Sequence, residues 1–267
     1  MERLFKEEIA MKKIGISLLT YNHWDYTDKA IDSLIKNINY PSTLVILDDN
    51  STDGTQDKLI QKRIVTMCPS ILSVRYIWKR ENVGLIKGRN ETFKKILEDK
   101  DVEYILVVHN DHLITSKMLD GMLEVFDKEP KAAVVGAEIW QGGPPPEDLE
   151  AQTQHDYKSE WYRGNSHPVL MKVSALKEVL MPDGNIYDES WAEAKAEAED
   201  IDLLGRLEDA GYKTLVTKTA WAWHKGELTR SEHPDTQKRK VYARTMYERK
   251  WNKLKRIPWD HRRNVSY

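Results

Sequence analysis

The first half of the chain alternates short apolar runs with amphipathic stretches. Four apolar runs of strand length lie at residues 12–19, 43–47, 72–78 and 104–108. The stretches between them place apolar residues three or four positions apart, as at Ile31, Leu34 and Ile38, which is the spacing of one helix face. Strand and helix in alternation predict a parallel sheet covered by helices on both faces, which is an α/β fold.

The second half of the chain is less regular. Apolar runs predict strands over residues 133–137 and 214–223, and the pattern over residues 199–211 predicts a helix that ends at Gly211. A Gly- and Pro-rich segment over residues 141–154 predicts an exposed loop. We find no internal repeat, so the chain is interpreted as one α/β domain with an extension at each end.

Composition places the 267-residue chain among ordinary globular proteins, with 40% hydrophobic and 31% charged residues. This excludes collagen-like and mostly disordered chains, and the net charge of -2 argues against wholesale nucleic-acid binding. The single cysteine, Cys68, cannot form an internal disulfide, which favours a reducing compartment. No apolar run reaches the roughly 18–20 residues that span a bilayer, and residues 1–8 are too charged for a signal peptide. We expect a cytoplasmic protein, with peripheral attachment at the inner membrane face as the alternative.

Polar clusters directly follow three of the four predicted strands in the first half. They are Thr20-Tyr21-Asn22, Asp48-Asp49-Asn50 and His109-Asn110-Asp111. One such cluster is unremarkable because turns favour Asp and Asn. Three of them at equivalent strand ends are harder to explain as solvated loops, since ligands of parallel sheets bind outside the carboxyl ends of the strands. The sequence therefore predicts a ligand site at this edge of the sheet.

The order and spacing of these clusters and of several later motifs resemble family 2 glycosyltransferases with the GT-A fold. The later motifs are Asn82-x-Gly84 with Arg89-Asn90, Gly184-Asn185-Ile186-Tyr187-Asp188-Glu189, and Glu199-Asp200-Ile201-Asp202 with Arg206. The resemblance covers roughly residues 12–226. It implies a mostly parallel nucleotide-binding sheet flanked by helices. It also implies transfer of a sugar from a nucleotide-diphosphate sugar, a UDP-sugar, to a hydroxyl acceptor with inversion.

The resemblance also divides the chain into domains. Residues 11–227 are expected to form the GT-A catalytic domain, with a nucleotide-sugar-binding half over 11–112 and an acceptor-binding half over 113–227. Residues 1–10 are an N-terminal extension, and residues 228–267 are a basic C-terminal helical extension.

For the donor, the family uses the second acid of the Asp48-Asp49 pair to read the base, a role that falls to Asp49. A carboxylate there accepts the N3–H of uracil, a hydrogen bond that cytosine cannot offer. The alternative is that both acids only begin a turn and cap the next helix. The remaining nucleotide-sugar-binding candidates are Thr20, Tyr21, Asn22, Gly84, Lys87 and Asn110. Of these, Lys87 is a candidate phosphate contact, whereas Arg89-Asn90 is expected to be structural.

The cluster His109-Asn110-Asp111 stands where the family carries its Asp-x-Asp metal element. The resemblance implies that Asp111 is the direct ligand of Mn²⁺ or Mg²⁺, which neutralises the leaving diphosphate. His224, after the last predicted strand, is a further metal candidate, as are His109 and His112. The site has fewer carboxylates than the family pattern, which puts metal dependence in question. The alternative role for Asp111 is to cap a helix that begins near Thr115.

Glu199 and Asp200 open the last predicted helix, whose positive N-terminal end keeps carboxylates ionised. The family uses the second acid as the general base that deprotonates the acceptor hydroxyl, so this role falls to Asp200. The alternative is a favourable N-terminal charge pair without catalytic function. Trp161, Asn165 and Glu199 are acceptor-site candidates, because aromatic faces suit sugars.

The C-terminal extension carries twelve Lys and Arg against four Asp and Glu over residues 228–267. Three interpretations remain open: a helix docked on the catalytic domain, an interfacial helix on anionic lipid, and a contact to nucleic acid. The acceptor is a glycan, a lipid-linked saccharide, a small molecule or a modified nucleobase.

Two further functions compete with the glycosyltransferase. One is a catalytically weakened module that only binds nucleotide sugars, which His109 and Asn110 in place of acids would favour. The other is a nucleotidyltransferase, which requires a Gly-rich, basic signature after the first strand. That position holds Thr20-Tyr21-Asn22 instead, so this function is disfavoured.

Overall fold

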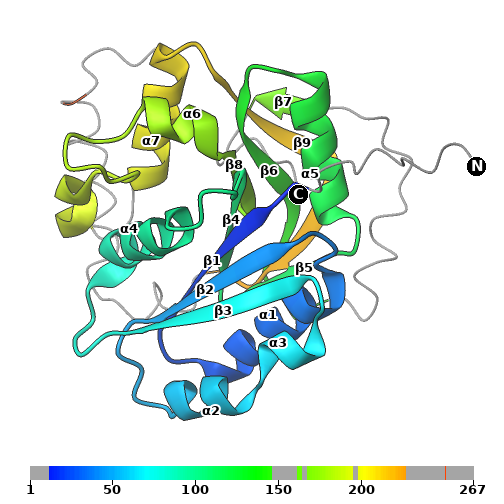
Figure 1. Ribbon diagram of the computed structural model, residues 1–267, viewed down its shortest axis with the longest axis vertical. Helices are drawn as coiled ribbons and strands as arrows, with labels where there is room; N and C mark the ends of the chain where they lie inside the picture. Colours follow the sequence, from blue (N-terminus) through cyan, green and yellow to red (C-terminus); the bar gives the residue numbers. More distant parts are fainter. Residues whose placement is uncertain (1–11, 146–160, 164–166, 195–197, 227–249, 251–267) are drawn as a thin grey trace, which may run out of the picture.

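One mixed sheet runs through the protein and carries the strand ends on which the site is built (Figure 1). The computed structural model describes residues 12–145, 161–163, 167–194, 198–226 and 250. Within them, nine strands pair in the order β3-β2-β1-β4-β8-β6-β9-β5, and β7 pairs with β9. The strands are β1 (Ile14–Thr20), β2 (Ser42–Asp48), β3 (Ile71–Trp78), β4 (Tyr104–His109), β5 (His112–Ile114), β6 (Ala132–Gln141), β7 (Trp161–Arg163), β8 (Val169–Lys172) and β9 (Lys213–His224).

Strands β1 to β4 form the all-parallel part of this sheet, as the alternation of strand and helix predicts. β1 pairs in parallel with both β2 and β4, and β2 pairs in parallel with β3. The register places Thr20 beside Asp48 and Leu19 beside His109. The polar clusters that follow β1, β2 and β4 therefore share one edge of the sheet, and the predicted α/β fold is confirmed.

The second half of the sheet is mostly antiparallel. β8 runs antiparallel to β4 and β6, while β9 is parallel to β6 and antiparallel to β5 and β7. The sequence did not predict β5, β7 or β8, because runs of three or four residues are too short to show a period. The pairing of β5 with β9 sets His112 opposite His224.

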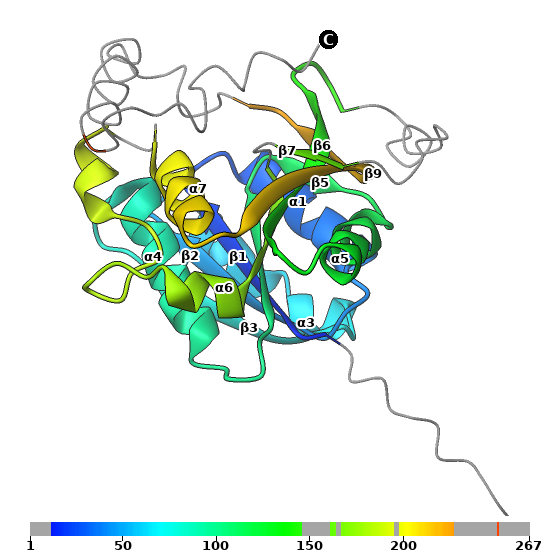
Figure 2. The same cartoon turned by 90° about the horizontal axis from the view of Figure 1, so that it is seen from above.

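Helices cover both faces of the sheet. They are α1 (Trp24–Asn37), α2 (Thr55–Gln61), α3 (Ile64–Met67), α4 (Gly84–Leu97), α5 (Met118–Lys128), α6 (Val173–Glu178) and α7 (Glu199–Asp209), with a 3-10 helix η2 (Glu189–Ala194). α1, α2, α3 and α5 pack on one face and α4, α6 and α7 on the other. Figure 2 shows α1, α3 and α5 on the opposite side of the sheet from α4, α6 and α7. The sequence predicts a single helix over about residues 56–66, between β2 and β3, but Arg63 adopts a positive φ of 48° and separates α2 from α3.

Each face has its own apolar core. Ile16 and Leu18 of β1 pack with Leu34 of α1, while Val107 of β4 packs with Phe93 of α4. Among the described residues, no helix combines the length and apolar character that crossing a membrane requires. The N-terminal extension, most of the predicted loop over 141–154 and all of the C-terminal extension except Lys250 lie outside the described residues.

Candidate active site at the carboxyl ends of the strands

Asp48 and Asp53 organise the loop after β2. Asp48 Oδ2 accepts hydrogen bonds from the Ser51 backbone N–H at 3.0 Å and from Gln56 Nε2 at 2.7 Å. Asp53 Oδ2 accepts the Trp24 backbone N–H at 3.0 Å, which ties this loop to the start of α1. Both carboxylates are therefore used by the local fold, in keeping with a structural role.

Asn22 joins the loop after β1 to the same loop. Its side-chain oxygen accepts the Thr52 backbone N–H at 2.8 Å, and its own backbone N–H donates to Ser51 Oγ at 2.7 Å. Asn22 adopts a φ of 52°, a left-handed conformation that Asn tolerates better than most residues. Tyr21, just before it, is half-buried. These two hydrogen bonds thus join the loop after β1 to the loop after β2.

Asp49 connects the loop after β2 to the loop that precedes α4. Its two carboxylate oxygens accept the backbone N–H groups of Val83 at 2.7 Å and of Gly84 at 2.9 Å. Gly84 has a φ of 81°, which a residue with a side chain would adopt only with strain. Burial raises the pKa of Asp49, and the two backbone hydrogen bonds and Lys79 only partly offset it. Asp49 therefore does not cap α2, and it keeps acceptor capacity, since a carboxylate offers about four lone-pair positions.

Asn110 and Thr20 meet at the start of α1. The hydroxyls of Thr20 and Thr27 hydrogen-bond to each other at 2.8 Å, and Asn110 Nδ2 donates to Thr27 Oγ1 at 3.2 Å. The side-chain oxygen of Asn110 is left for other partners. Lys87 is exposed on the first turn of α4, close in sequence to Gly84.

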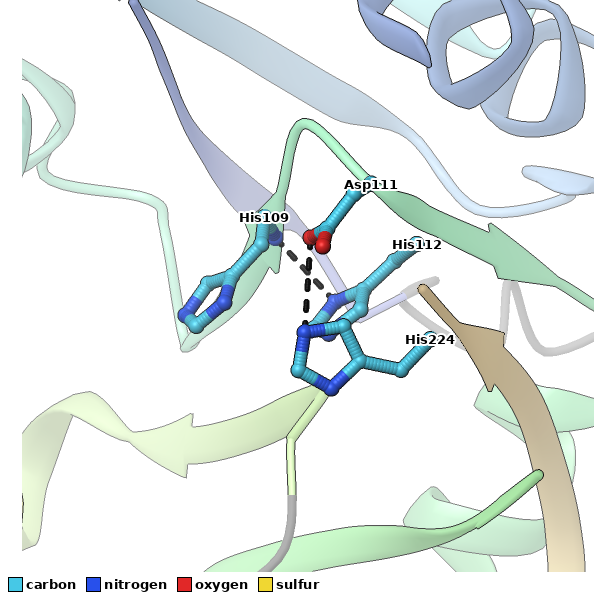
Figure 3. Close-up of side chains that lie close together, drawn as sticks. All are labelled: His109, Asp111, His112 and His224. Atoms are coloured by element: carbon cyan, nitrogen blue, oxygen red, sulfur yellow. Dashed lines mark hydrogen bonds and ion pairs between the residues drawn. The ribbon is translucent and has the colours of Figure 1, made fainter. Parts of the chain in front are cut away.

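Asp111 lies in the turn between β4 and β5, facing the end of β9. Its Oδ2 accepts the Gly226 backbone N–H at 3.0 Å, and its Oδ1 lies 3.4 Å from His224 Nε2 (Figure 3). Asp111 does not cap the following helix, because α5 begins only at Met118 and has Lys117 as its N-cap residue. Its carboxylate is aimed at an imidazole that the β5–β9 pairing brings close.

His109, His112 and His224 surround this carboxylate. One ligand atom from each of these histidines and from Asp111 lies within 4.8 Å of the others. The rings of His109 and His112 stack with their centroids 4.7 Å apart, and His224 meets His112 edge to face at 4.3 Å. Burial and the neighbouring histidines hold the pKa values of His109 and His112 well below the usual value. Both rings are therefore neutral near pH 7, with a lone pair on one nitrogen each.

The donor set fits a divalent cation. Two ligands bound at about 2.0–2.1 Å to one ion are about 2.8–3.0 Å apart at octahedral angles and about 3.3–3.4 Å apart at tetrahedral angles. The 3.4 Å separation between Asp111 Oδ1 and His224 Nε2 lies at the upper end of this range. His112 is less suited as a ligand, because its Nδ1 accepts the His109 backbone N–H at 3.1 Å, which leaves the proton of the neutral ring on Nε2. That Nε2 is buried without a hydrogen-bond partner among the described residues.

Asp200 lies on the first turn of α7 and is linked to this cluster by His167. His167 Nε2 is 3.8 Å from Asp200 Oδ2, and the His167 ring stacks on His109 at 5.0 Å. Asp200 Oδ1 also accepts the Ile201 backbone N–H at 2.8 Å. Glu199 and Asp200 are both buried. Residues that are about 90 positions apart in the sequence, Asp111 and Asp200, therefore belong to one contiguous group of side chains.

His167 was not among the sequence-based candidates. It stands just before the short strand β8, which the sequence did not predict either, so no motif pointed to it. Its place in the site follows from β8 pairing with β4, the strand that ends in His109.

Arg89 was expected to be structural, and its hydrogen bonds connect β1 and β4 near their carboxyl ends. It is 1% exposed and donates to the Ser17 carbonyl of β1 and to the Val108 carbonyl of β4, each at 2.7 Å. Burial lowers the pKa of Arg89 to about 10, so the guanidinium stays charged near pH 7. This buried positive charge lies close enough to Glu199 for the two to interact electrostatically.

A pocket opens beside Asp111 on the α1 side. Its lining includes Tyr26 and Lys29 of α1, Pro144 and Trp223. Lys29, which was not predicted, lines this pocket together with Asp111. Of the acceptor candidates, Trp161 pairs with Thr217 through its backbone in β7, and Asn165 lies outside the described residues.

Comparison with known proteins assigns the family. The pattern of the family described as Glycosyl transferase family 2 matches residues 16–195, more than half of the chain. The chain therefore belongs to this family, whose members are glycosyltransferase enzymes.

Three solved structures of glycosyltransferases share the fold. The mannosyltransferase PcManGT from Pyrobaculum calidifontis, in complex with GDP-Man and Mn²⁺, gives a TM-score of 0.64 at 14% identity, over 96% of this chain and 70% of that chain. GalNAc-T7 with UDP, GalNAc and Mn²⁺ gives 0.62 at 13% identity, over 94% and 52%. S. aureus TarS 1–349 in complex with UDP-GlcNAc gives 0.56 at 18% identity, over 88% and 66%. The match to a longer TarS chain spans 36% of that chain. These likenesses establish the GT-A fold.

Proposed function

We propose that this protein transfers a sugar from a nucleoside-diphosphate sugar to a hydroxyl acceptor, with inversion at the anomeric carbon. The observation that carries the proposal is the contiguous group formed by Asp111, His224, His109, His167 and Asp200. It places a candidate metal site and a candidate base next to each other at the edge of the sheet where parallel folds bind ligands. Family membership supports the reaction class.

The donor is proposed to be a UDP-sugar, with its base next to Asp49. Asp49 directly follows β2, which lies two strands away from β4, so Asp49 is about 10 Å from the His109 end at the usual strand spacing. A nucleoside diphosphate is long enough to reach from one to the other. Thr20, Tyr21, Asn22, Gly84 and Asn110 are the further residues proposed to contact it, and Lys87 and Lys29 are proposed to bind the phosphates. GDP-Man in one structural relative makes a guanosine donor the alternative to test.

Asp111 and His224 are proposed to hold the divalent cation, which stabilises the negative charge of the departing diphosphate. The imidazole nitrogen favours Mn²⁺ over Mg²⁺, since Mg²⁺ prefers oxygen ligands and imidazole suits transition metals. Mn²⁺ accompanies two of the structural relatives. The buried Nε2–H of His112 would donate to a water or phosphate oxygen at this position, which removes the cost of leaving it without an acceptor.

Asp200 is proposed to be the general base. The acceptor oxygen would form its bond to the anomeric carbon while the bond from that carbon to the diphosphate oxygen breaks and its electron pair leaves with the UDP. Asp200 would take the hydroxyl proton in this step. The first turn of α7 favours the ionised carboxylate through the helix dipole. Attack from the face opposite the leaving group gives inversion.

A test of this function measures UDP and GDP release from a panel of nucleotide sugars with Mn²⁺, Mg²⁺ or EDTA. We expect release from UDP-sugars in Mn²⁺, and loss of release in EDTA. NMR of the transferred sugar in an acceptor-driven reaction reads inversion directly. Retention at the anomeric carbon would contradict the role of Asp200, and preference for GDP-sugars would contradict the role of Asp49.

The second candidate is a module that binds nucleotide sugars without transferring them. His109 in the place of a carboxylate favours it, because the site then holds one acid, Asp111, where the family pattern has two. Tight binding of UDP-sugars by calorimetry, without hydrolysis or transfer to glycan, lipid-linked, small-molecule or nucleic-acid acceptors, would favour this candidate over the enzyme.

A further inference from the structure

Lys250 is the only residue after position 226 that the structure describes, and it contacts the acceptor half. Its ammonium lies 2.6 Å from Asp188 Oδ2 and 2.6 Å from Asp202 Oδ1. It also lies over the indole ring of Trp191, 5.5 Å from the ring centroid. One cation of the basic C-terminal extension thus meets two carboxylates and an aromatic face.

The two carboxylates depend on this cation electrostatically. The side chain of Asp202 is fully buried and that of Asp188 is 13% exposed. Burial opposes ionisation of Asp188, yet the pKa of Asp188 is lowered, because the hydrogen bonds from Lys250 and Ser190 outweigh it. Arg206 Nε lies 3.2 Å from the other oxygen of Asp202. Loss of Lys250 would remove the cation that these two poorly solvated carboxylates share, and removing one partner of a buried ion pair is strongly destabilising.

The contacts of Lys250 connect two segments that shape the site. Asp188 directly precedes η2, which carries Trp191, and Asp202 lies on the first turn of α7, two residues after Asp200. Arg206 of α7 makes a similar connection, since its Nη2 donates to the Ile186 carbonyl at 2.6 Å. The first turn of α7 is therefore held by Arg206 of its own helix and by Lys250.

We propose that Lys250 is a positioning residue that holds the first turn of α7 against the segment before η2, so that Asp200 keeps its orientation toward the site. The role of Asp200 rests on the proposed function above. The ammonium of Lys250 is paired with two carboxylates.

The test compares Lys250→Met, Lys250→Arg and wild type by hydrogen exchange and by kinetics in the full chain. In Lys250→Met we expect amide exchange over residues 198–203 and 186–191 to speed up about tenfold or more, because a local contact is lost. We expect kcat for transfer to fall about tenfold with the KM for donor unchanged, since only the orientation of the base changes. Lys250→Arg, which keeps the charge, should remain within about threefold of wild type in both readouts.

Lys12→Met is a matched control. Lys12 has a side-chain exposure of 27%, against 33% for Lys250, and pairs with Asp127 on α5, away from α7. It should change neither exchange at residues 198–203 nor kcat. The double variant Lys250→Met with Asp188→Asn should recover part of the lost kcat, because it removes one of the two charges left without the ammonium.

The outcomes separate this proposal from the proposed function. Exchange in Lys250→Met that equals wild type, or a rise in KM for donor with kcat unchanged, overturns the positioning role in an active enzyme. Faster exchange without any loss of kcat overturns it as well. A wild-type chain that turns over no nucleotide sugar overturns the proposed function instead, and in that case exchange alone decides whether Lys250 holds the first turn of α7.

Discussion

The two sides of the candidate site are built from different kinds of contact. On the side of β1 and β2, carboxylates and amides bind backbone N–H groups, as Asp49 binds Val83 and Gly84. On the side of β4 and β9, side chains also meet other side chains, as Asp111 meets His224 and His167 meets Asp200. The first arrangement fixes the shape of loops, and the second brings nitrogen and oxygen atoms of several side chains close together.

This difference predicts how substitutions on each side behave. Changes on the backbone-binding side should alter loop structure and nucleotide affinity together, because the same atoms serve both. Changes on the other side should alter metal binding or turnover while the fold remains intact. The predictions below start with the largest effect.

Asp200→Asn should have the largest effect of any single change. An amide cannot accept the hydroxyl proton, so kcat for transfer should fall by about 100-fold or more. Affinity for UDP, measured by calorimetry, should stay within about twofold, since Asp200 does not contact the nucleotide in the proposed function. Asp209→Asn, at the other end of α7, is the control. Undiminished transfer by Asp200→Asn would disprove the assignment of the base.

Asp111→Asn should weaken metal binding strongly and leave the fold intact. Loss of the anionic ligand should weaken Mn²⁺ binding by about 100-fold, and His224→Ala should weaken it by about tenfold. Mn²⁺ electron paramagnetic resonance measures both without requiring turnover. Asp120→Asn removes an exposed carboxylate that binds the Tyr40 hydroxyl on α1's side of the sheet and should leave Mn²⁺ affinity unchanged. Equal Mn²⁺ affinity in all three variants would place the cation elsewhere.

Asp49→Ala should lower stability and UDP affinity at the same time. Two backbone N–H groups, of Val83 and Gly84, lose their acceptor, which should cost about 1–3 kcal/mol in the free energy of unfolding. UDP affinity should fall about tenfold, as a uracil contact is lost. Denaturant unfolding and calorimetry measure the two effects. A loss of stability with unchanged UDP affinity would show that Asp49 only holds the loop before α4.

The pH dependence distinguishes Asp49 from Asp188. The pKa of Asp49 is raised, first by burial, so its ionised form is lost at a higher pH than usual for Asp. UDP affinity should therefore fall as the pH is lowered through this raised pKa, and Asp49→Asn should remove that step. The effect of Asp49 on stability runs in the opposite direction to its effect on UDP affinity. Asp49 contributes stability below its unfolded pKa, and this stability is lost as the pH rises through the folded pKa. Asp188, with a lowered pKa, contributes stability above its unfolded pKa that is lost as pH falls.

The candidate site residues that the sequence suggested follow long, regular elements. Asp49, Asp111 and Asp200 each stand next to a buried strand or at a helix start that hydrophobic periodicity reveals. The α/β class and the parallel strands β1 to β4 follow from the same periodicity. The separation of α2 and α3 could not be predicted, because it depends on Arg63 adopting a positive φ.

The residues that the sequence did not reveal are those whose role comes from tertiary contacts. His167 enters the site because β8 inserts antiparallel between β4 and β6. The paired residues of β4 and β8 are 62 to 68 positions apart in the sequence, and local pattern does not encode such a pairing. Lys250 was one of twelve cations in the C-terminal extension, and only its contacts with Asp188 and Asp202 distinguish it. Side-chain contacts between distant segments are decided by packing, which short-range periodicity does not report.

Lys87→Met should have the smallest effect of the site changes. Lys87 is exposed on the first turn of α4, so its charge is screened by solvent and its contact with a phosphate should change UDP affinity by only about two- to fivefold. The effect should shrink as salt is raised, and uridine without phosphates should bind both proteins equally. Lys94→Met, an exposed lysine in the last turn of the same helix, is the matched control and should change nothing. If the two variants lose UDP affinity equally, the phosphates are held from the α1 side, where Lys29 lies beside Asp111.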